Sequence, residues 1–190
     1  MVIYSIMQAL VTLLPEPFFQ MVEDIWTELE TGFGCQHTFT RPKPHFTWQY
    51  ADSYDDTYPP KLEEICSGVS SFETQTDVVT RFSESDPVLF LRIVPTPELI
   101  ALHQKLWEGL SPFWYKPSLL YQPADWVPHI TLSMGTDSWC HQKAAIDFLT
   151  SLKLHWTFKV DRLTMLELNE NNEWDGGKVF FFGRGDTSRS

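Results

Sequence analysis

Two short stretches decide the fold: Pro-His-Phe-Thr at residues 44–47 and Pro-His-Ile-Thr at residues 128–131. With 13 Pro and 6 His among 190 residues, a Pro-His pair followed two places later by Thr is expected by chance only about 0.04 times. Two copies therefore need a cause other than composition. The histidines are 129 − 45 = 84 residues apart, which suggests two related halves.

Each stretch offers an imidazole and a hydroxyl on the same side of a strand. Successive side chains of a strand point to opposite faces, so His45 and Thr47 share one face, and His129 and Thr131 do the same. An imidazole can take or give a proton near neutral pH, and a hydroxyl can donate to an anionic oxygen. If both pairs face one cleft, one histidine can activate a water while the other protonates the leaving oxygen of a phosphodiester. A lone strand histidine is more often structural, but its recurrence in the same phrase favours chemistry.

Hydrophobic periodicity and turn residues predict a mixed order of strands and helices. We expect strands over residues 2–14, 43–51, 72–82, 87–94, 127–134, 156–168 and 178–183, helices over 17–31, 59–69, 97–110 and 138–151, and loops over 112–126 and 169–177. This order predicts an α+β fold in which an antiparallel-rich sheet carries helices on its outside. A chain of this size with 43% hydrophobic residues is expected to form one domain, residues 1–190, with two lobes.

Charge and cysteine content narrow the class of ligand and the compartment. The formal net charge is −11, which opposes the long-range attraction needed to hold an extended nucleic-acid backbone. A phosphate-bearing ligand should therefore be small. Three scattered cysteines without a CxxC pair favour a reducing compartment. The apolar run at residues 3–14 is interpreted as a strand and not as a leader, and the expected protein is cytoplasmic, monomeric and not bound to a membrane.

Further residues are candidates for ligand contacts. Arg41 and Lys43 share the parity of His45 and could supply local positive charge, although a solvated start of the strand is the alternative. Tyr121 and Trp126 lie close to His129 in the sequence and could stack on a base, although such aromatic residues often cover the edge of a core. The remaining histidines show no metal-ligand spacing, so neither a metal nor a cofactor is predicted.

The chain resembles the two-histidine (2H) phosphoesterase superfamily, because residues 45–47 and 129–131 match its paired His-x-Thr signature. That superfamily includes the 2′-5′ RNA ligase-like proteins and cyclic nucleotide phosphodiesterases. The resemblance implies a bilobal α+β fold with pseudo-twofold symmetry and a central cleft. It further implies that His45 and His129 are an acid–base pair, that Thr47 and Thr131 bind phosphate oxygens, and that no metal is required.

The resemblance also implies the range of activities. Members cleave 2′,3′-cyclic phosphates or 2′-5′ linkages, and some run a ligation in reverse. The acidic charge and the stretch RPKPHFTWQY at residues 41–50 depart from the ligase-like members, so the substrate stays open. We expect a metal-independent phosphodiesterase that opens a 2′,3′-cyclic phosphate on a nucleotide or short oligonucleotide. The alternatives are a 2′-5′ phosphodiesterase or ligase-like enzyme, and a non-catalytic module that binds nucleotides or RNA ends.

Overall fold

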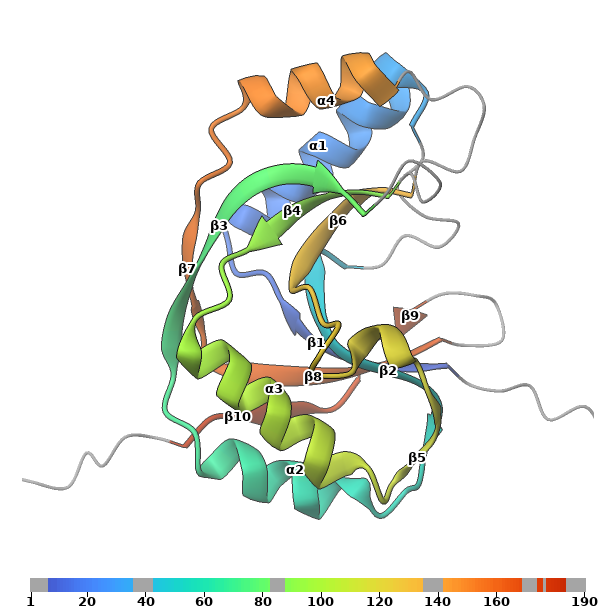
Figure 1. The fold of residues 1–190 in the computed structure, drawn as a ribbon, viewed down its shortest axis with the longest axis vertical. Coiled ribbons are helices and arrows are strands. Elements are labelled where there is room, and N and C mark those ends of the chain that lie inside the picture. The colour runs from blue at the N-terminus through green and yellow to red at the C-terminus, as the bar shows by residue number, and fades with distance from the viewer. Residues whose placement is uncertain are drawn as a thin grey trace, which may run out of the picture.

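The strands form one curved antiparallel sheet in this computed structural model, which describes residues 7–35, 43–82, 88–134, 142–168, 174–175 and 177–183. The order across the sheet is β10-β8-β1-β2-β6-β4-β3-β7, with β5 beside β2 and β9 beside β8. Figure 1 shows how strongly the sheet curls. The strands are β1 (Gln8–Leu13), β2 (His45–Tyr54), β3 (Phe72–Arg81), β4 (Leu89–Ile93), β5 (Trp114–Pro117), β6 (His129–Ser133), β7 (Thr157–Val160), β8 (Arg162–Leu168), β9 (Trp174–Asp175) and β10 (Val179–Phe181).

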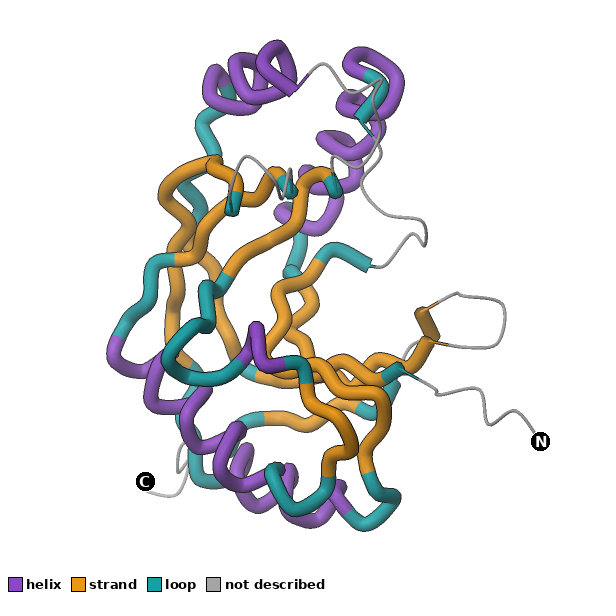
Figure 2. The backbone as a smooth tube through the Cα atoms, turned by 45° about the vertical axis from the view of Figure 1, so that its right-hand side comes forward, coloured by secondary structure: helices purple, strands orange, loops and turns teal. Residues whose placement is uncertain are grey.

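The helices gather in two pairs at opposite ends of the molecule (Figures 1 and 2). They are α1 (Phe18–Phe33), α2 (Tyr58–Ser67), α3 (Pro97–Leu110) and α4 (Gln142–Ser151). Helices α2 and α3 pack on each other and on β10 and β2, whereas α1 and α4 pack on each other and on β6 and β3. We call β10-β8-β1-β2 with α2 and α3 the first lobe, and β6-β4-β3-β7 with α1 and α4 the second lobe. The predicted bilobal α+β fold is confirmed.

Local sequence explains where the helices lie. In α1, Val22, Ile25, Trp26 and Leu29 are buried because they recur at helical spacing on the side that faces the sheet. Helix α3 begins where the side chain of Thr96 accepts a hydrogen bond from the backbone N–H of Leu99 at 3.3 Å, with Pro97 at the first helical position, as the sequence predicts. The apolar faces of the helices and of the sheet merge into one large core.

Three predicted elements differ in the structure, the first being the loop expected over 169–177, which contains β9 (Trp174–Asp175) paired with β8. Residues 112–126, expected to be a loop, contain β5, whose Tyr115 pairs with Ser53 on β2, because aromatic residues favour an available strand edge. The strand expected over 156–168 is broken at Asp161 into β7 and β8. These two strands then join different parts of the sheet, β7 beside β3 and β8 beside β1. Among the described residues, no helix is long and apolar enough to cross a membrane.

The two Pro-His-x-Thr stretches meet at the centre of the sheet. Strand β2 pairs with β6 in the antiparallel sense, with Phe46 opposite Ile130. Both side chains are buried and belong to the core. The residues on either side of this pair, which include both histidines and both threonines of the motifs, therefore point to the opposite face. The junction between the two lobes is also the junction between the two motifs.

Candidate active site

A cavity of about 170 Å³ lies where the two motifs meet. Its lining includes all four predicted motif side chains: His45, Thr47, His129 and Thr131. The remaining lining residues are Ala9, Trp26, Tyr50, Tyr121, Met134 and Trp174. Two half-buried strands from different lobes thus bring an imidazole and a hydroxyl each to one small space.

The structure explains why a proline precedes the histidine in each Pro-His-x-Thr motif. Pro44 and Pro128 are buried, and proline has no backbone N–H that would need a partner there. Their carbonyl oxygens accept hydrogen bonds from neighbouring strands, Pro44 from the N–H of Leu14 and Pro128 from the N–H of Ile93, each at 2.9 Å. A proline also favours an extended backbone in the residue before it. The chain therefore enters both strands in the same way.

Both imidazoles are held by the backbone in the same tautomer. His45 donates from Nδ1 to the carbonyl of Lys43 at 2.6 Å, and His129 donates from Nδ1 to the carbonyl of Val127 at 2.7 Å. A carbonyl oxygen can only accept, so Nδ1 must carry the hydrogen in each ring. In the neutral imidazole Nε2 is then an acceptor, and in the protonated ring it is a donor. Each histidine is thereby ready to exchange a proton through Nε2.

The surroundings favour the neutral form of both rings in the free protein. Burial lowers the pKa of His45 below its ordinary value, the hydrogen bond to Lys43 opposes this in part, and the nearby charge of His129 lowers it further. Burial also lowers the pKa of His129, against the effect of its bond to Val127. Both rings line the same cavity, so a charge on one disfavours a charge on the other. An anion bound between them would reverse these shifts by favouring the charged ring.

Aromatic rings fix the plane of the second histidine. The rings of Phe82 and Phe90 each lie 5.0 Å from the His129 ring between centroids, at interplanar angles of 88° and 57°. Edge-to-face contacts of this kind favour defined ring orientations. Phe82 is 43% exposed, so it covers His129 from the solvent side, whereas Phe90 is buried behind it.

Hydrogen bonds hold the backbones of both motif threonines and the side chain of Thr47. The Thr47 hydroxyl is hydrogen-bonded to the phenol of Tyr121, whose pKa is raised by burial and lowered in part by that bond. The carbonyl of Thr47 accepts a hydrogen bond from the indole Nε1–H of Trp126 at 3.1 Å. The carbonyl of Thr131 accepts one from the indole of Trp26, also at 3.1 Å. In both motifs, therefore, the carbonyl of the threonine accepts a hydrogen bond from a tryptophan indole.

A β-bulge adds a residue to the cavity that the sequence does not reveal. Thr47 pairs with Val11 and Gln49 pairs with Leu10 on β1, so Trp48 is an extra residue on β2. A bulge shifts the alternation of side chains along a strand. Trp48 and Gln49 consequently both face the interior, and Tyr50 returns to the cavity beside Thr47. Regular alternation would have sent Tyr50 to the opposite face.

A second, larger cavity of about 470 Å³ adjoins the first. The two share Tyr121, His129, Thr131 and Met134. The other lining residues of the larger cavity are Phe82, Val88, Leu120, Asp125, Trp126 and Val127. Of the described residues that line either cavity, Asp125 alone carries a charge at neutral pH. The site is thus a small polar pocket that opens into a mostly apolar one.

Of the residues predicted to contact a ligand, two line a cavity, one does not and one lies outside the described residues. Tyr121 lines both cavities. Trp126 lines the larger one, and its ring packs almost parallel on His103, at 3.8 Å between centroids and 3° between planes. That face of Trp126 is not open to a base. Lys43 contributes its backbone carbonyl to His45 while its side chain is exposed, and Arg41 lies outside the described residues.

Trp26, Tyr50, Phe82 and Trp174 were not predicted as site residues. Their nearest sequence signal is their aromatic character, which does not distinguish them from core residues. Trp26, for example, belongs to the apolar stripe of α1 and still lines the cavity. Its position depends on how α1 packs on β6, which no local pattern specifies.

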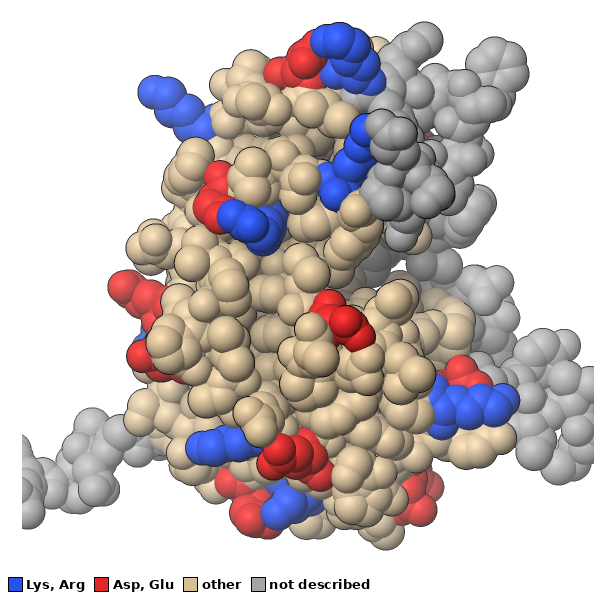
Figure 3. Space-filling view, in the orientation of Figure 1, with Lys and Arg blue, Asp and Glu red and all other residues tan. Residues whose placement is uncertain are grey.

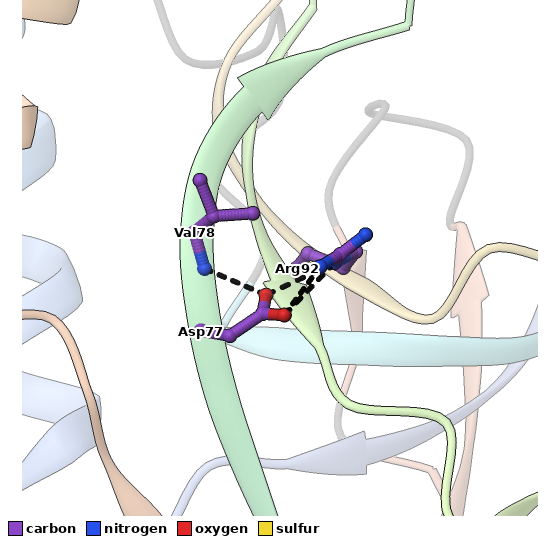
Figure 4. A network of polar contacts seen from close by, with 3 residues as sticks. All are labelled: Asp77, Val78 and Arg92. Atoms are coloured by element: carbon purple, nitrogen blue, oxygen red, sulfur yellow. Dashed lines mark hydrogen bonds and ion pairs between the residues drawn. The ribbon is translucent and has the colours of Figure 1, made fainter.

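A cation on the neighbouring strand is already paired. Arg92 on β4 is the partner of His129 in the strand register. Figure 4 shows its guanidinium against the carboxylate of Asp77, which also accepts the backbone N–H of Val78 at 2.6 Å. Arg92 Nε lies 3.0 and 3.2 Å from the two carboxylate oxygens, and this contact lowers the pKa of Asp77. Asp77 and Val78 lie in an irregularity of β3 opposite Arg92, so the ion pair stabilises that irregularity.

Charged side chains are otherwise scattered. On the face in Figure 3, Lys and Arg are interspersed with Asp and Glu and form no continuous basic stripe. Within the part of the chain that the structure describes, no three His, Cys, Asp or Glu side chains are grouped as metal ligands.

Comparison with solved structures places the fold. LigT of E. coli, in a crystal structure complexed with 3′-AMP, superimposes with a TM-score of 0.59 at 12% sequence identity, and the match covers 95% of this chain and 99% of LigT. TT0787 of Thermus thermophilus gives a TM-score of 0.64 at 14% identity, covering 94% of this chain and 100% of TT0787. Identities this low establish a shared fold only.

Sequence comparison identifies the family. "Putative phosphoesterase GK0864" of Geobacillus kaustophilus is 30% identical over 151 residues, which are 76% of this chain and 81% of the relative. The sequence model of the 2′-5′ RNA ligase superfamily matches residues 15–172, a range that contains both His-x-Thr motifs. The resemblance expected from the paired motifs is confirmed, and the chain belongs to the 2′-5′ RNA ligase superfamily.

Proposed function

We propose that this phosphoesterase hydrolyses a 2′,3′-cyclic phosphate at the end of a nucleotide or short oligonucleotide. The observation that carries the proposal is the matched hydrogen bonding of the two imidazoles. His45 and His129 line one cavity, and each donates from Nδ1 to a backbone carbonyl. Both rings therefore keep Nε2 for proton exchange, one as base and the other as acid.

The reaction needs one proton taken and one given. One neutral histidine accepts a proton from water at Nε2 as the water oxygen attacks phosphorus. The bond from phosphorus to one ribose oxygen breaks, and the other histidine, protonated, donates its Nε2 hydrogen to that oxygen. The products are a nucleoside phosphate monoester and a free hydroxyl. Two groups on opposite sides of the phosphate suit this in-line displacement, and the hydroxyls of Thr47 and Thr131 would donate to the non-bridging oxygens.

The charge of the site favours a diester. A cyclic phosphate carries one negative charge, whereas a monoester carries close to two at neutral pH. None of the described residues that line the smaller cavity is a lysine or an arginine, and Asp125 is the charged residue of the larger one. One protonated histidine can balance a single negative charge. A dianionic product is less well balanced, which promotes its release.

The larger cavity is suited to the nucleoside part. Its lining of Phe82, Val88, Leu120 and Trp126 is apolar, and it shares His129 and Thr131 with the smaller cavity, so a base could lie there while the phosphate reaches the histidines. Tyr121 lines both parts and is the candidate for contact with the ribose or base. LigT has been crystallised with 3′-AMP, NADP+ and ATP, which supports a ligand of nucleotide size for this fold.

The proposal is tested by a substrate panel in the presence of a chelator. Purified protein is incubated with EDTA and with 2′,3′-cyclic mononucleotides, 2′-5′ dinucleotides or 3′-5′ dinucleotides, and products are separated by chromatography. Conversion of the cyclic substrates to monoesters is expected, with little cleavage of 3′-5′ linkages. Preferred cleavage of 2′-5′ dinucleotides would instead support the second enzymatic assignment. Binding without turnover at any pH would support a binding module, and loss of activity in EDTA that a divalent ion restores would overturn metal independence.

A further inference from the structure

We infer that Trp26 and Trp126 are a matched pair of positioning residues that set the separation of the two motifs. Each indole donates its N–H to the backbone carbonyl of a motif threonine at 3.1 Å, Trp126 to Thr47 and Trp26 to Thr131. The inference rests on the proposed function, because the separation matters only if both motifs act on one phosphate.

The two contacts connect the motifs by different routes. Trp126 lies three residues before His129 in the chain, yet its indole bonds to Thr47 of the first motif. Trp26 lies on α1, which follows β1 in the chain, and β1 pairs with the first motif on β2. Its indole bonds to Thr131 of the second motif. Helix α1 itself packs on β6 in the second lobe, so Trp26 links the second motif to the first through the chain connection between α1 and β1, whereas Trp126 links them through the short segment that leads to His129.

These contacts occur at the weakly paired junction of β2 and β6, while on their other sides Thr47 pairs with Val11 of β1 and Thr131 with Phe90 of β4. Within the described residues, β2 and β6 are in register through Phe46 and Ile130, and beyond that pair lie the threonines. A buried carbonyl without a partner is costly, so a donor is needed at each threonine. An indole N–H from outside the two strands gives the carbonyl of each threonine a donor that does not come from the other motif.

Packing makes both donors rigid. Trp126 packs on His103 at 3.8 Å and on Trp48 at 5.3 Å between ring centroids, and His103 is itself buried, with Nε2 3.2 Å from the carbonyl of Trp48. Trp26 is 8% exposed and belongs to the main core. Side chains held in this way fix the position of a backbone carbonyl to within the tolerance of the packing.

The test removes each indole N–H in two ways, with a smaller ring and with a ring of the same size. Trp26→Phe and Trp126→Phe are made, together with the isosteric benzothienylalanine at each position, which replaces the N–H by sulfur. Trp156→Phe is the matched control, because its indole nitrogen is buried without a hydrogen-bond partner among the described residues. Hydrolysis of a 2′,3′-cyclic mononucleotide is followed with kcat and KM resolved. Inorganic phosphate is titrated against the NMR signals of His45 and His129 as a readout independent of turnover.

We expect either N–H deletion to lower kcat about tenfold or more, because small misplacements of reacting groups are costly, and to change KM less than about threefold. The double variant should lose less than the product of the single losses, since both contacts set one distance. The phosphate-induced shifts of the two histidine signals should become unequal. The control should stay within about twofold of the wild type in kcat.

The possible outcomes distinguish a failure of the positioning role from a failure of the proposed phosphodiesterase activity. If the wild type neither turns over a substrate nor responds to phosphate, the proposed function fails. If the wild type is active and the benzothienylalanine variants match it in kcat and in histidine signals, the positioning role is overturned. If Trp156→Phe loses as much kcat as the two test variants, the effect belongs to general packing, and the inference is again overturned.

Discussion

Phe46 of β2 and Ile130 of β6 face each other across an antiparallel pair, and among the described residues this is the pair that joins the two lobes at their centre. His45 and Thr47 flank Phe46, and His129 and Thr131 flank Ile130, so all four side chains lie on the face opposite to this buried pair and line one cavity. This pair between the lobes thus brings both motifs to the same small space.

Removing either histidine should abolish most of the activity without unfolding the protein. We expect His45→Ala and His129→Ala each to lower kcat by about 10²–10⁴-fold, the usual contribution of positioned acid–base catalysis. The double variant should fall short of the product of both losses, because the groups act as a unit. The exposed His155 supplies the control, His155→Ala, which should be fully active. Near-normal turnover in either single variant, measured beside circular dichroism, would make that histidine structural.

The pH dependence of kcat/KM should be bell-shaped with its centre below about 6.5, the ordinary pKa of histidine. Burial lowers the pKa of both His45 and His129 in the free protein, so the form with one proton shared between them is most populated below that value. Bound phosphate favours the charged ring and should move the profile of kcat upward relative to that of kcat/KM. Initial rates from pH 4.5 to 8.5 at low and saturating substrate measure both profiles. A centre above pH 7 in kcat/KM would contradict the lowered pKa values.

His103 should make the protein less stable in mild acid. Burial lowers its pKa from 6.5 to about 4, so the unfolded chain binds a proton at a pH where the folded protein does not. Stability contributed by the neutral ring is thus present above pH 6.5 and is lost as pH falls toward 4. At 1.36 kcal/mol per pH unit, the loss between pH 7.5 and pH 5 is about 2 kcal/mol. Urea unfolding of the wild type and of His103→Gln measures it, since only the wild type carries this titration, and equal pH dependence in both would refute the assignment.

Asp125 should weaken the binding of dianions. Its carboxylate lines the larger cavity. Asp125→Asn is therefore expected to tighten competitive inhibition by a nucleoside monophosphate several-fold. It should change the KM of a monoanionic cyclic substrate, or the Kd of a neutral ligand, less. Added salt should reduce the difference, because it screens exposed charges. Asp147→Asn, on the exposed surface of α4 where Asp147 pairs with Lys143, is the control of equal charge change. The same tightening in both variants would indicate an effect of net charge alone.

Ligand length should matter little. A protein of net charge −11 that engages one or two phosphates should show a slope of log affinity against log salt of about −1 to −2. We expect mono- to trinucleotides to bind as well as longer strands. Lys43→Ala should make the slope shallower if its exposed side chain meets a phosphate, whereas Tyr121→Ala should weaken binding at an unchanged slope. Affinity that keeps rising with strand length would reveal an extended nucleic-acid groove.

The sequence predicts the features of the site that depend on neighbours along the chain. The shared face of His45 and Thr47 follows from strand alternation, and the start of α3 follows from Thr96 and Pro97. Tyr50 could not be assigned, because the bulge at Trp48 depends on how β2 pairs with Leu10 and Val11. Long-range packing decides such residues, and no local pattern encodes it.

Long-range packing also decides the position of the Trp126 indole and the break between β7 and β8 at Asp161. Trp126 was a candidate for stacking on a base, and the sequence did not indicate its packing on His103 or its bond to Thr47, because these contacts span 23 and 79 residues. The strand expected over 156–168 is one apolar stretch by composition. Its division into β7 and β8 becomes visible only when β3 and β1 offer separate edges.

The interleaving of the two lobes along the chain has a consequence for motion. The backbone passes from β1 in the first lobe to α1 in the second and back to β2, and it passes again between α2 and β3, between β4 and α3, before β6, and at Asp161 between β7 and β8. Domain closure about a hinge needs a few flexible connections, whereas here many covalent links span the boundary. The cleft should hence be largely preformed, and substrate binding would not have to spend affinity on shifting a population from an open to a closed state.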